Sequence, residues 1–146
     1  MTKISIVNRA MTSEEIDLMD KGFDELYAEE GVDVERKEII SFVANLENTI
    51  IGCVSGSAFK SGDNYTEWFY IDELFVEKAY RSDGLGTKLV VALENHLKTL
   101  GIKRIWLWTS GDKAIRFYRR QGYNPFTKLE NWYSDGSDRV GLRKDI

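Results

Sequence analysis

The segment from Trp68 to Thr87 restricts the fold of this 146-residue chain more than any other. Residues 68–76 are mostly aromatic or β-branched, a composition that favours a strand inside a sheet. Gly84 and Gly86 follow this run, and apolar residues then recur at the spacing of a helix as far as Leu97. The segment therefore predicts a strand, a loop and a helix, in that order.

Apolar patterns elsewhere in the chain predict the remaining elements. Strands are expected at residues 4–7, at residues 38–46 and 49–59 as a hairpin, at residues 104–109, from Tyr123 onward, and around Val140 and Leu142. Helices are expected after the cap at residues 12–15, from Leu85 to near Gly101, and from Ala114 to Gln121. This order predicts one mixed α/β domain over residues 1–146, with a single central sheet.

The charge of the chain bears on its partners. Lys and Arg number 20 and Asp and Glu number 24, which gives a formal net charge of −4. Binding to a phosphate backbone requires clustered Lys and Arg, so nucleic acid is not expected as a partner. A net negative protein attracts cations instead, which favours an amine as the substrate.

Cysteine and histidine are nearly absent, which limits covalent and metal chemistry. Cys53 is the only cysteine, so no intrachain disulfide is expected, and we expect it to be a small buried residue. His96 is the only histidine, so no metal site is expected. The first thirty residues are charged, and no apolar run reaches the roughly 20 residues that span a bilayer. We therefore expect a cytoplasmic protein that does not bind membranes.

The loop from Arg81 to Gly86 is a candidate anion site. It lies between a predicted strand and a predicted helix, where backbone N–H groups and the helix dipole converge on negative charge. Gly84 and Gly86 lack a Cβ, which lets a phosphate approach the main chain, and Arg81 adds a positive charge. A tight turn without a ligand is the alternative. The loop lacks the third glycine of a dinucleotide site and the GK[ST] of a P-loop.

Two motifs resemble the GNAT acetyltransferase superfamily. The run from Asp72 to Val76, followed by residues 79–87, resembles the family's central motif, whose signature is R/Q-x-x-G-x-G/A. Residues 113–123 are similar to the family's A-x-x-F-Y-x-x-x-G-F/Y segment, and the predicted order of elements agrees across nearly the whole chain. The resemblance implies a mostly antiparallel, splayed sheet flanked by helices, the GNAT fold.

The resemblance also implies how acetyl-CoA, the acetyl donor, is held. The backbone at Leu74, Phe75 and Val76 is expected to pair with the pantetheine arm as an added strand does. The pyrophosphate is expected to lie on the loop, with charge from Arg81 and backbone contacts from Ser82, Asp83, Gly84, Leu85, Gly86 and Thr87. Many relatives carry asparagine where this chain has Gly111, so one cofactor contact is in doubt. Ser110 or Asp112 are possible substitutes, although we favour Asp112 as the cap of the next helix.

Three residues are candidates for the chemistry. By the resemblance, Tyr118 lies near the cofactor sulfur and is positioned to protonate the departing thiolate, although periodicity alone indicates an ordinary aromatic on an amphipathic helix. Asp72 and Glu73 precede Leu74 on the same predicted strand and point to opposite faces of the sheet. One of them is therefore expected to take a proton from the acceptor amine. A salt bridge or a solvated strand end is the alternative for both, and we favour Asp72.

The predicted function is N-acetyl transfer from acetyl-CoA to a primary amine by direct attack. A small cationic acceptor, such as an aminoglycoside or a polyamine, suits the acidic strand. A peptide or protein amine is an alternative acceptor, and a non-catalytic acyl-CoA sensor is an alternative function. Trp106 and Trp108 are expected to pack inside the protein, whereas Trp132 and Tyr133 are candidates to line an acceptor pocket. A homodimer through residues 139–146 is possible.

Overall fold

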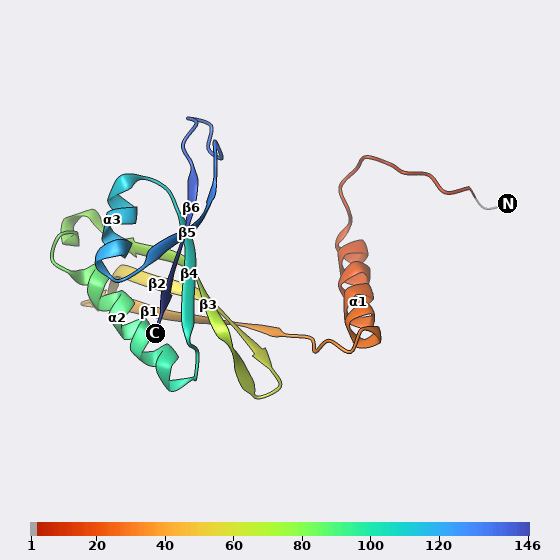
Figure 1. The fold of residues 1–146 in the computed structure, drawn as a ribbon, viewed down its shortest axis with the longest axis horizontal. Coiled ribbons are helices and arrows are strands. Elements are labelled where there is room, and N and C mark those ends of the chain that lie inside the picture. The colour runs from red at the N-terminus through yellow and green to blue at the C-terminus, as the bar shows by residue number, and fades with distance from the viewer. Residues whose placement is uncertain (1–2) are drawn as a thin grey trace. The chain divides into compact units, whose positions relative to one another are not determined.

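The structure is a computed structural model that describes residues 3–146. They fall into two compact units, of which the first ends at Val34 and the second runs from Glu35 to Ile146 (Figure 1). No helix among residues 3–146 is long and apolar enough to cross a membrane. That residues 1–146 form a single domain stays a prediction.

The first unit contains one helix, α1 (Ser13–Glu29), with the predicted cap at its start. The Glu15 N–H donates to Thr12 Oγ1 at 3.1 Å, and the Thr12 N–H donates back to Glu15 Oε1 at 2.8 Å. The Arg9 guanidinium and the Thr12 N–H lower the pKa of Glu15 to about 2. The strand expected at residues 4–7 is wrong, because residues 3–34 of this unit, as far as the structure describes them, contain no strand with which it can pair.

The second unit is built on one six-stranded sheet in the order β1-β2-β3-β4-β6-β5. Its strands are β1 (Arg36–Leu46), β2 (Thr49–Ser61), β3 (Asn64–Val76), β4 (Arg104–Thr109), β5 (Asn124–Leu129) and β6 (Arg139–Asp145). Its helices are η1 (Lys78–Tyr80), α2 (Leu85–Thr99) and α3 (Asp112–Arg120). Only β3 and β4 run parallel, which confirms the mixed, mostly antiparallel fold.

Most predicted boundaries lie within a few residues of the observed ones. The hairpin of β1 and β2 turns at Glu47 and Asn48, both with positive φ, as a two-residue turn requires. Strand β3 begins at Asn64 rather than near Trp68, because the turn at Gly62 is tight enough for Ser61 and Asn64 to pair. Strand β6 lies between β4 and β5, so neither of its edges is free to pair with a second copy.

The core of the second unit lies between the sheet and its helices, which occupy the same side of the strands in Figure 1. Helix α2 contributes an apolar stripe of fully buried side chains, Val90, Leu93 and Leu97. Strand β4 alternates, with Ile105 and Leu107 buried and its tryptophans only half-buried. One face of the sheet therefore packs under the helices, and the other carries the aromatic residues of β4.

The pairing of β3 with β4 ends early. It covers only Trp68 to Tyr70 on β3 and Arg104 to Trp106 on β4, although β3 continues to Val76. On its other edge β3 stays paired with β2 as far as Val76, opposite Gly52. Beyond Tyr70 the two parallel strands therefore diverge, as the expected splayed sheet requires.

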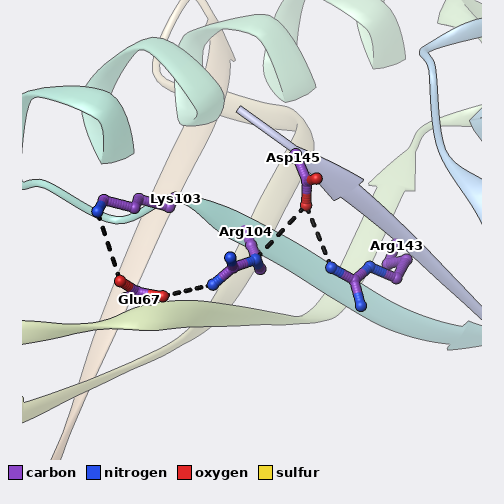
Figure 2. A network of polar contacts seen from close by, with 5 residues as sticks. All are labelled: Glu67, Lys103, Arg104, Arg143 and Asp145. Carbon is purple, nitrogen blue, oxygen red and sulfur yellow. Dashed lines mark hydrogen bonds and ion pairs between the residues drawn. The ribbon is translucent and has the colours of Figure 1, made fainter.

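A network of charges ties the strands together at the opposite, closed end (Figure 2). Glu67 accepts from Lys103 at 3.4 Å and from Arg104, while Asp145 pairs with Arg104 at 3.7 Å and with Arg143 at 3.2 Å. These groups are largely solvent-exposed, so each pair contributes little free energy by itself. Arg104, which pairs with both Glu67 and Asp145, nevertheless joins the ends of β3, β4 and β6. Strands β3 and β4 diverge at the opposite end.

Candidate functional site

A cleft of about 930 Å³ opens where β3 and β4 diverge. Its walls are the end of β3, the loop and first turn of α2, the end of β4, and helix α3. Among the predicted site residues, those that line the cleft are Asp72, Leu74, Phe75, Val76, Arg81, Ser82, Gly84, Leu85, Gly86, Thr87 and Tyr118. Glu73 and Asp83 are not among its lining residues. We call residues 82–87 the loop end of the cleft. We call Asp72 and Trp108 its bulge end, because Asp72 occupies a β-bulge in β3.

The β3 segment from Leu74 to Val76 presents to the cleft a backbone edge that β4 leaves unpaired, although its Val76 carbonyl is taken by the Arg81 side chain. Its other edge is paired with β2, but no residue of β4 pairs with it. Unpaired N–H and C=O groups along such an edge can accept an extended, amide-containing ligand as a further strand. Arg81 is fixed beside this edge, because its Nε donates to the Val76 carbonyl at 2.8 Å and its guanidinium lies 5.8 Å from the Phe75 ring.

The loop end of the cleft is shaped for an anion. Ser82 and Gly84 both have positive φ, near 78° and 77°, which turns successive N–H groups toward one side. Gly84 occupies the N-cap position of α2, and no side chain caps that end of the helix. The first N–H groups of α2 and its positive dipole therefore meet no capping side chain and are available to a phosphate.

Gly86 lies where the first turn of α2 meets α3. A Cβ at this position would lie 3.4 Å from the Phe117 ring, which is an ordinary contact. Gln121 Nε2 donates to Thr87 Oγ1 at 2.9 Å and ties the end of α3 to the same turn of α2. The two motifs, separate in sequence, thus form one wall of the cleft.

Tyr118 lies on α3, lines the cleft and is almost fully buried, with 7% of its surface exposed. Burial raises the pKa of its phenol to about 12. The phenol is therefore a neutral hydrogen-bond donor at physiological pH. Its ring packs edge-on against Phe117 and Tyr123, with centroids at 5.1 and 5.5 Å.

A buried polar cluster stands behind Tyr118. The Tyr123 hydroxyl donates to Glu94 Oε2 at 3.1 Å, and Lys144 Nζ lies 2.9 Å from the same carboxylate oxygen. Burial and the Glu94 carboxylate both raise the pKa of Tyr123. Glu94 comes from α2 and Lys144 from β6, so the cluster fixes the ring that supports Tyr118 to two other elements.

Asp72 occupies a β-bulge at the edge of the cleft. Ser55 pairs with Glu73 and Gly56 with Ile71, so Asp72 is the extra residue with no partner on β2. Its carboxylate lines the cleft and accepts a hydrogen bond from Ser57 Oγ at 3.1 Å. Asp72 and Glu73 are both solvent-exposed, but Glu73 does not line the cleft. The structure thus separates the two carboxylates, whose chemical roles stay predictions.

Several residues that line the cleft escaped the sequence analysis. Tyr80, Lys113 and Arg120 belong to no motif signature, but all three lie along the cleft wall. Trp108 also lines the cleft rather than only packing inside the protein, and the guanidinium of Arg139 lies between its ring and that of Trp132, at 5.0 and 5.2 Å. The strand alternation that buries Ile105 and Leu107 was the available signal for Trp108.

The start of α3 differs from expectation. Asp112 is its first residue rather than its N-cap, and no side chain caps this end. The N-cap is Gly111, with φ 82° and ψ 140°, a conformation that favours glycine. Ser110, Gly111 and Asp112 all line the cleft. Backbone geometry therefore accounts for glycine at this position, where many members of the GNAT superfamily carry asparagine.

Cys53 and His96, for which the sequence predicted no thiol or metal chemistry, have ordinary surroundings in the structure. Cys53 is half-buried rather than buried. His96 is exposed on α2, and its ring lies edge-on to Phe42 at 5.6 Å. Among residues 3–146, no three side chains of His, Cys, Asp or Glu lie close enough together to hold a metal ion.

Comparisons with known proteins agree with this geometry. The family model "Acetyltransferase (GNAT) family" matches residues 5–123. An uncharacterized N-acetyltransferase of Methanocaldococcus jannaschii is 30% identical over 70% of this chain and 64% of its own length. N-alpha-acetyltransferase 30 of Schizosaccharomyces pombe is 37% identical over 47% of each chain. Spermine/spermidine N(1)-acetyltransferase of Bacillus subtilis is 38% identical over 42% of each chain. The chain thus spans between 42% and 64% of these relatives.

Solved structures share the fold. An acetyltransferase of Bacillus cereus superposes with a TM-score of 0.77 at 24% identity, over 97% of this chain and 98% of that one. Naa50 of Arabidopsis thaliana, in complex with the bisubstrate analogue CoA-Ac-MVNAL, superposes with a TM-score of 0.63 at 21% identity, over 73% and 72% of the two chains. These superpositions show that the chain has the fold of these acetyltransferases.

Proposed function

This chain belongs to the GNAT family of acetyltransferases, and we propose that it transfers the acetyl group of acetyl-CoA to a primary amine of a small cationic acceptor. The observation that carries the proposal is the single cleft that joins an anion-binding loop, a strand edge that β4 leaves unpaired, a buried phenol and a carboxylate. Acetyl-CoA supplies an acetyl group activated as a thioester. The residues of the chain bind it, orient it and transfer protons.

The loop end of the cleft fits the pyrophosphate of CoA. Its support is the uncapped N-terminus of α2, the positive φ at Ser82 and Gly84, and the nearby charge of Arg81. Lys113 and Arg120 add positive charge along the same wall. The β3 edge from Leu74 to Val76 then offers backbone hydrogen bonds to the amide groups of pantetheine.

Asp72 and Tyr118 each carry out part of the proton transfer when the amine attacks the thioester directly. Asp72 binds the acceptor ammonium and takes one proton, directly or through a water, so that the nitrogen lone pair becomes available. The nitrogen forms the new bond to the acetyl carbon, the carbon–sulfur bond breaks, and Tyr118 donates its proton to the departing thiolate. The phenolate left on Tyr118 then takes the second proton of the acetylated nitrogen, directly or through a water, which completes the amide and restores the phenol. The raised pKa of Tyr118 keeps its phenol protonated at neutral pH.

The bulge end favours a small cationic acceptor. Asp72 supplies negative charge, and the Trp108 ring, over which the Arg139 guanidinium lies, adds aromatic surface against which an apolar linker can pack. The name of the Bacillus subtilis relative specifies polyamines. A polyamine presents a primary ammonium group on an apolar linker, which suits this pairing of a carboxylate and an aromatic ring.

The test is acetyl-CoA turnover with a panel of amines, followed by Tyr118→Phe. Removing the phenol proton donor is expected to lower kcat by about 100-fold or more while CoA affinity changes less than about threefold. Tyr80→Phe is the matched control, because it removes a phenol hydroxyl from another wall of the same cleft. An unchanged kcat for Tyr118→Phe contradicts the role of Tyr118 as the acid.

Two alternatives are distinguished by the same panel. A peptide acceptor is favoured by the names of the N-alpha-acetyltransferase 30 relative and of the Naa50 complex. A peptide with a free N-terminus that is acetylated faster than any polyamine or aminoglycoside would replace the small cationic acceptor. Tight CoA binding without turnover of any amine would indicate a sensor instead.

A further inference from the structure

We propose that Ser57 is a positioning residue that holds the Asp72 carboxylate in place for the acceptor amine. This inference rests on the proposed function. The Ser57 hydroxyl donates to Asp72 Oδ2 at 3.1 Å, across from β2 to β3. With Oδ2 held in this way, the carboxylate directs Oδ1 to the acceptor ammonium.

The β-bulge makes such a support necessary. Asp72 has no partner on β2, and it lies two residues beyond Tyr70, the last residue of β3 that pairs with β4. Asp72 therefore has no cross-strand partner directly opposite it on either neighbouring strand. A carboxylate at this point needs a specific hydrogen bond to keep one orientation, because an exposed Asp otherwise samples several rotamers.

The burial of Ser57 shows that its hydroxyl is committed to this contact. Ser57 is only 2% exposed, and it pairs with Tyr70, next to the bulge. A buried hydroxyl without a partner is costly, so the hydrogen bond to Asp72 satisfies it. The bond runs from a neutral donor to a carboxylate, which makes it stronger than a bond between two neutral groups.

Strand β2 carries a second serine, Ser55, whose hydroxyl contacts another serine instead of a carboxylate. Ser55 lies two residues before Ser57, on the same face of β2, and its Oγ is 2.7 Å from Ser41 Oγ on β1. Ser55→Ala therefore removes a hydroxyl of the same kind, from the same strand and the same face, without touching Asp72. Comparing Ser57→Ala with Ser55→Ala therefore separates the effect of losing a hydroxyl from β2 from the effect of losing the support for Asp72.

The experiment measures steady-state kinetics of Ser57→Ala with the best amine of the panel. The KM for the amine is expected to rise about tenfold, while the KM for acetyl-CoA stays within twofold of wild type, because only the acceptor contact loses its support. Ser55→Ala is expected to leave both constants within twofold. Ser57→Thr keeps the hydroxyl and is expected to recover at least half of the lost affinity.

A double-mutant cycle provides the decisive arm. In the Asp72→Asn background, Ser57→Ala is expected to have no further effect on the KM for the amine, because the two residues act through one contact. Additive effects, or a Ser57→Ala variant that behaves as Ser55→Ala does, would overturn the inference. If Ser57→Ala loses stability, Ser57→Thr and the cycle at a lower temperature answer the same question.

Failure of the proposed function gives a different result. In that case Asp72→Asn itself leaves the amine kinetics unchanged, or wild type acetylates no amine. A crystal structure of Ser57→Ala then decides the inference without turnover. Asp72 is expected to leave the orientation that it has beside Ser57, and a carboxylate that stays in place would refute the positioning role.

Discussion

The two ends of the cleft are built in different ways. The loop end comes from consecutive residues, 82–87, and presents mainly backbone N–H groups and a helix N-terminus. The bulge end depends on separate strands instead, because Asp72 of β3 and Trp108 of β4 both line the cleft and Ser57 of β2 donates to Asp72 from outside its lining. The proposed cofactor site is therefore specified by a local segment, while the proposed acceptor site depends on the register of separate strands.

The two ends also differ in charge, which the net charge of the chain conceals. The formal net charge is −4, but Arg81, Lys113 and Arg120 line the cleft around the proposed cofactor site. The bulge end instead carries the carboxylate of Asp72. The distribution of charge inside one cleft thus matches an anionic donor and a cationic acceptor, whatever the sum over the surface.

The largest expected effect concerns the scaffold of the bulge end. A Cβ at Gly56 would lie 2.2 Å from the Tyr70 carbonyl oxygen and 2.5 Å from the Phe69 ring, so Gly56→Ala is expected to lower the free energy of unfolding by at least about 3 kcal/mol. Urea denaturation measures this. Gly52→Ala, whose nearest backbone contact is 3.1 Å, is the milder control. Equal stability of the two variants would contradict the observed packing beside the bulge.

The loop end is tested by Gly86→Glu. A carboxylate in the anion site is expected to weaken CoA binding by more than about 100-fold, close to 3 kcal/mol, as isothermal titration calorimetry can measure. Gly86→Ala adds only a Cβ at 3.4 Å from Phe117 and is expected to bind CoA within a few-fold of wild type. Retained binding in Gly86→Glu would remove the loop from the cofactor site.

Alkaline pH tests the burial of Tyr118, which lies between the two ends. Its pKa is raised from about 10 in the unfolded chain to about 12, so above pH 10 the unfolded state releases a proton that the folded state keeps. Stability is therefore fully present below pH 10 and falls by about 2 to 3 kcal/mol as pH rises toward 12. Denaturation curves of Tyr118→Phe are expected to show a smaller fall over this range, and an identical slope would argue against burial.

The cluster behind Tyr118 is tested by Glu94→Gln. Removing the charge leaves the ammonium of Lys144 without its partner in a site where Glu94 is only 6% exposed, so a loss of about 2 kcal/mol is expected. Glu67→Gln removes an exposed carboxylate from the network of Figure 2 and is the matched control, with a much smaller expected loss. Thermal denaturation at one pH compares the two.

The smallest expected effect concerns Trp132, which does not line the cleft and is linked to Trp108 through Arg139. Trp132 is 54% exposed, and its ring stacks on Arg139, which also lies over Trp108. Trp132→Ala is expected to raise the KM for the amine two- to threefold, below about 1 kcal/mol, because Arg139 keeps its contact with Trp108. Trp132→Phe should restore the wild-type value. An unchanged KM would exclude Trp132 from acceptor binding.

The elements that the sequence predicted well are those that depend on local patterns. The capping box at Thr12 and the helix from Leu85 follow from side chains within one or two turns, and the structure confirms both. The strand expected at residues 4–7 failed because a strand exists only with a partner, which a local pattern cannot reveal. Asp112 failed as a cap because the positive φ of Gly111 starts the helix one residue earlier than expected.

The sequence by itself determined the family, the order of most elements and the candidate anion loop, because these depend on neighbours along the chain. The tertiary structure decided which carboxylate enters the cleft. A β-bulge turned Asp72 into the cleft, left Glu73 outside its lining, and set Ser57 beside it from another strand. Such a choice depends on which residues of β2 and β3 pair, and pairing between strands is fixed only when the whole sheet packs against its helices.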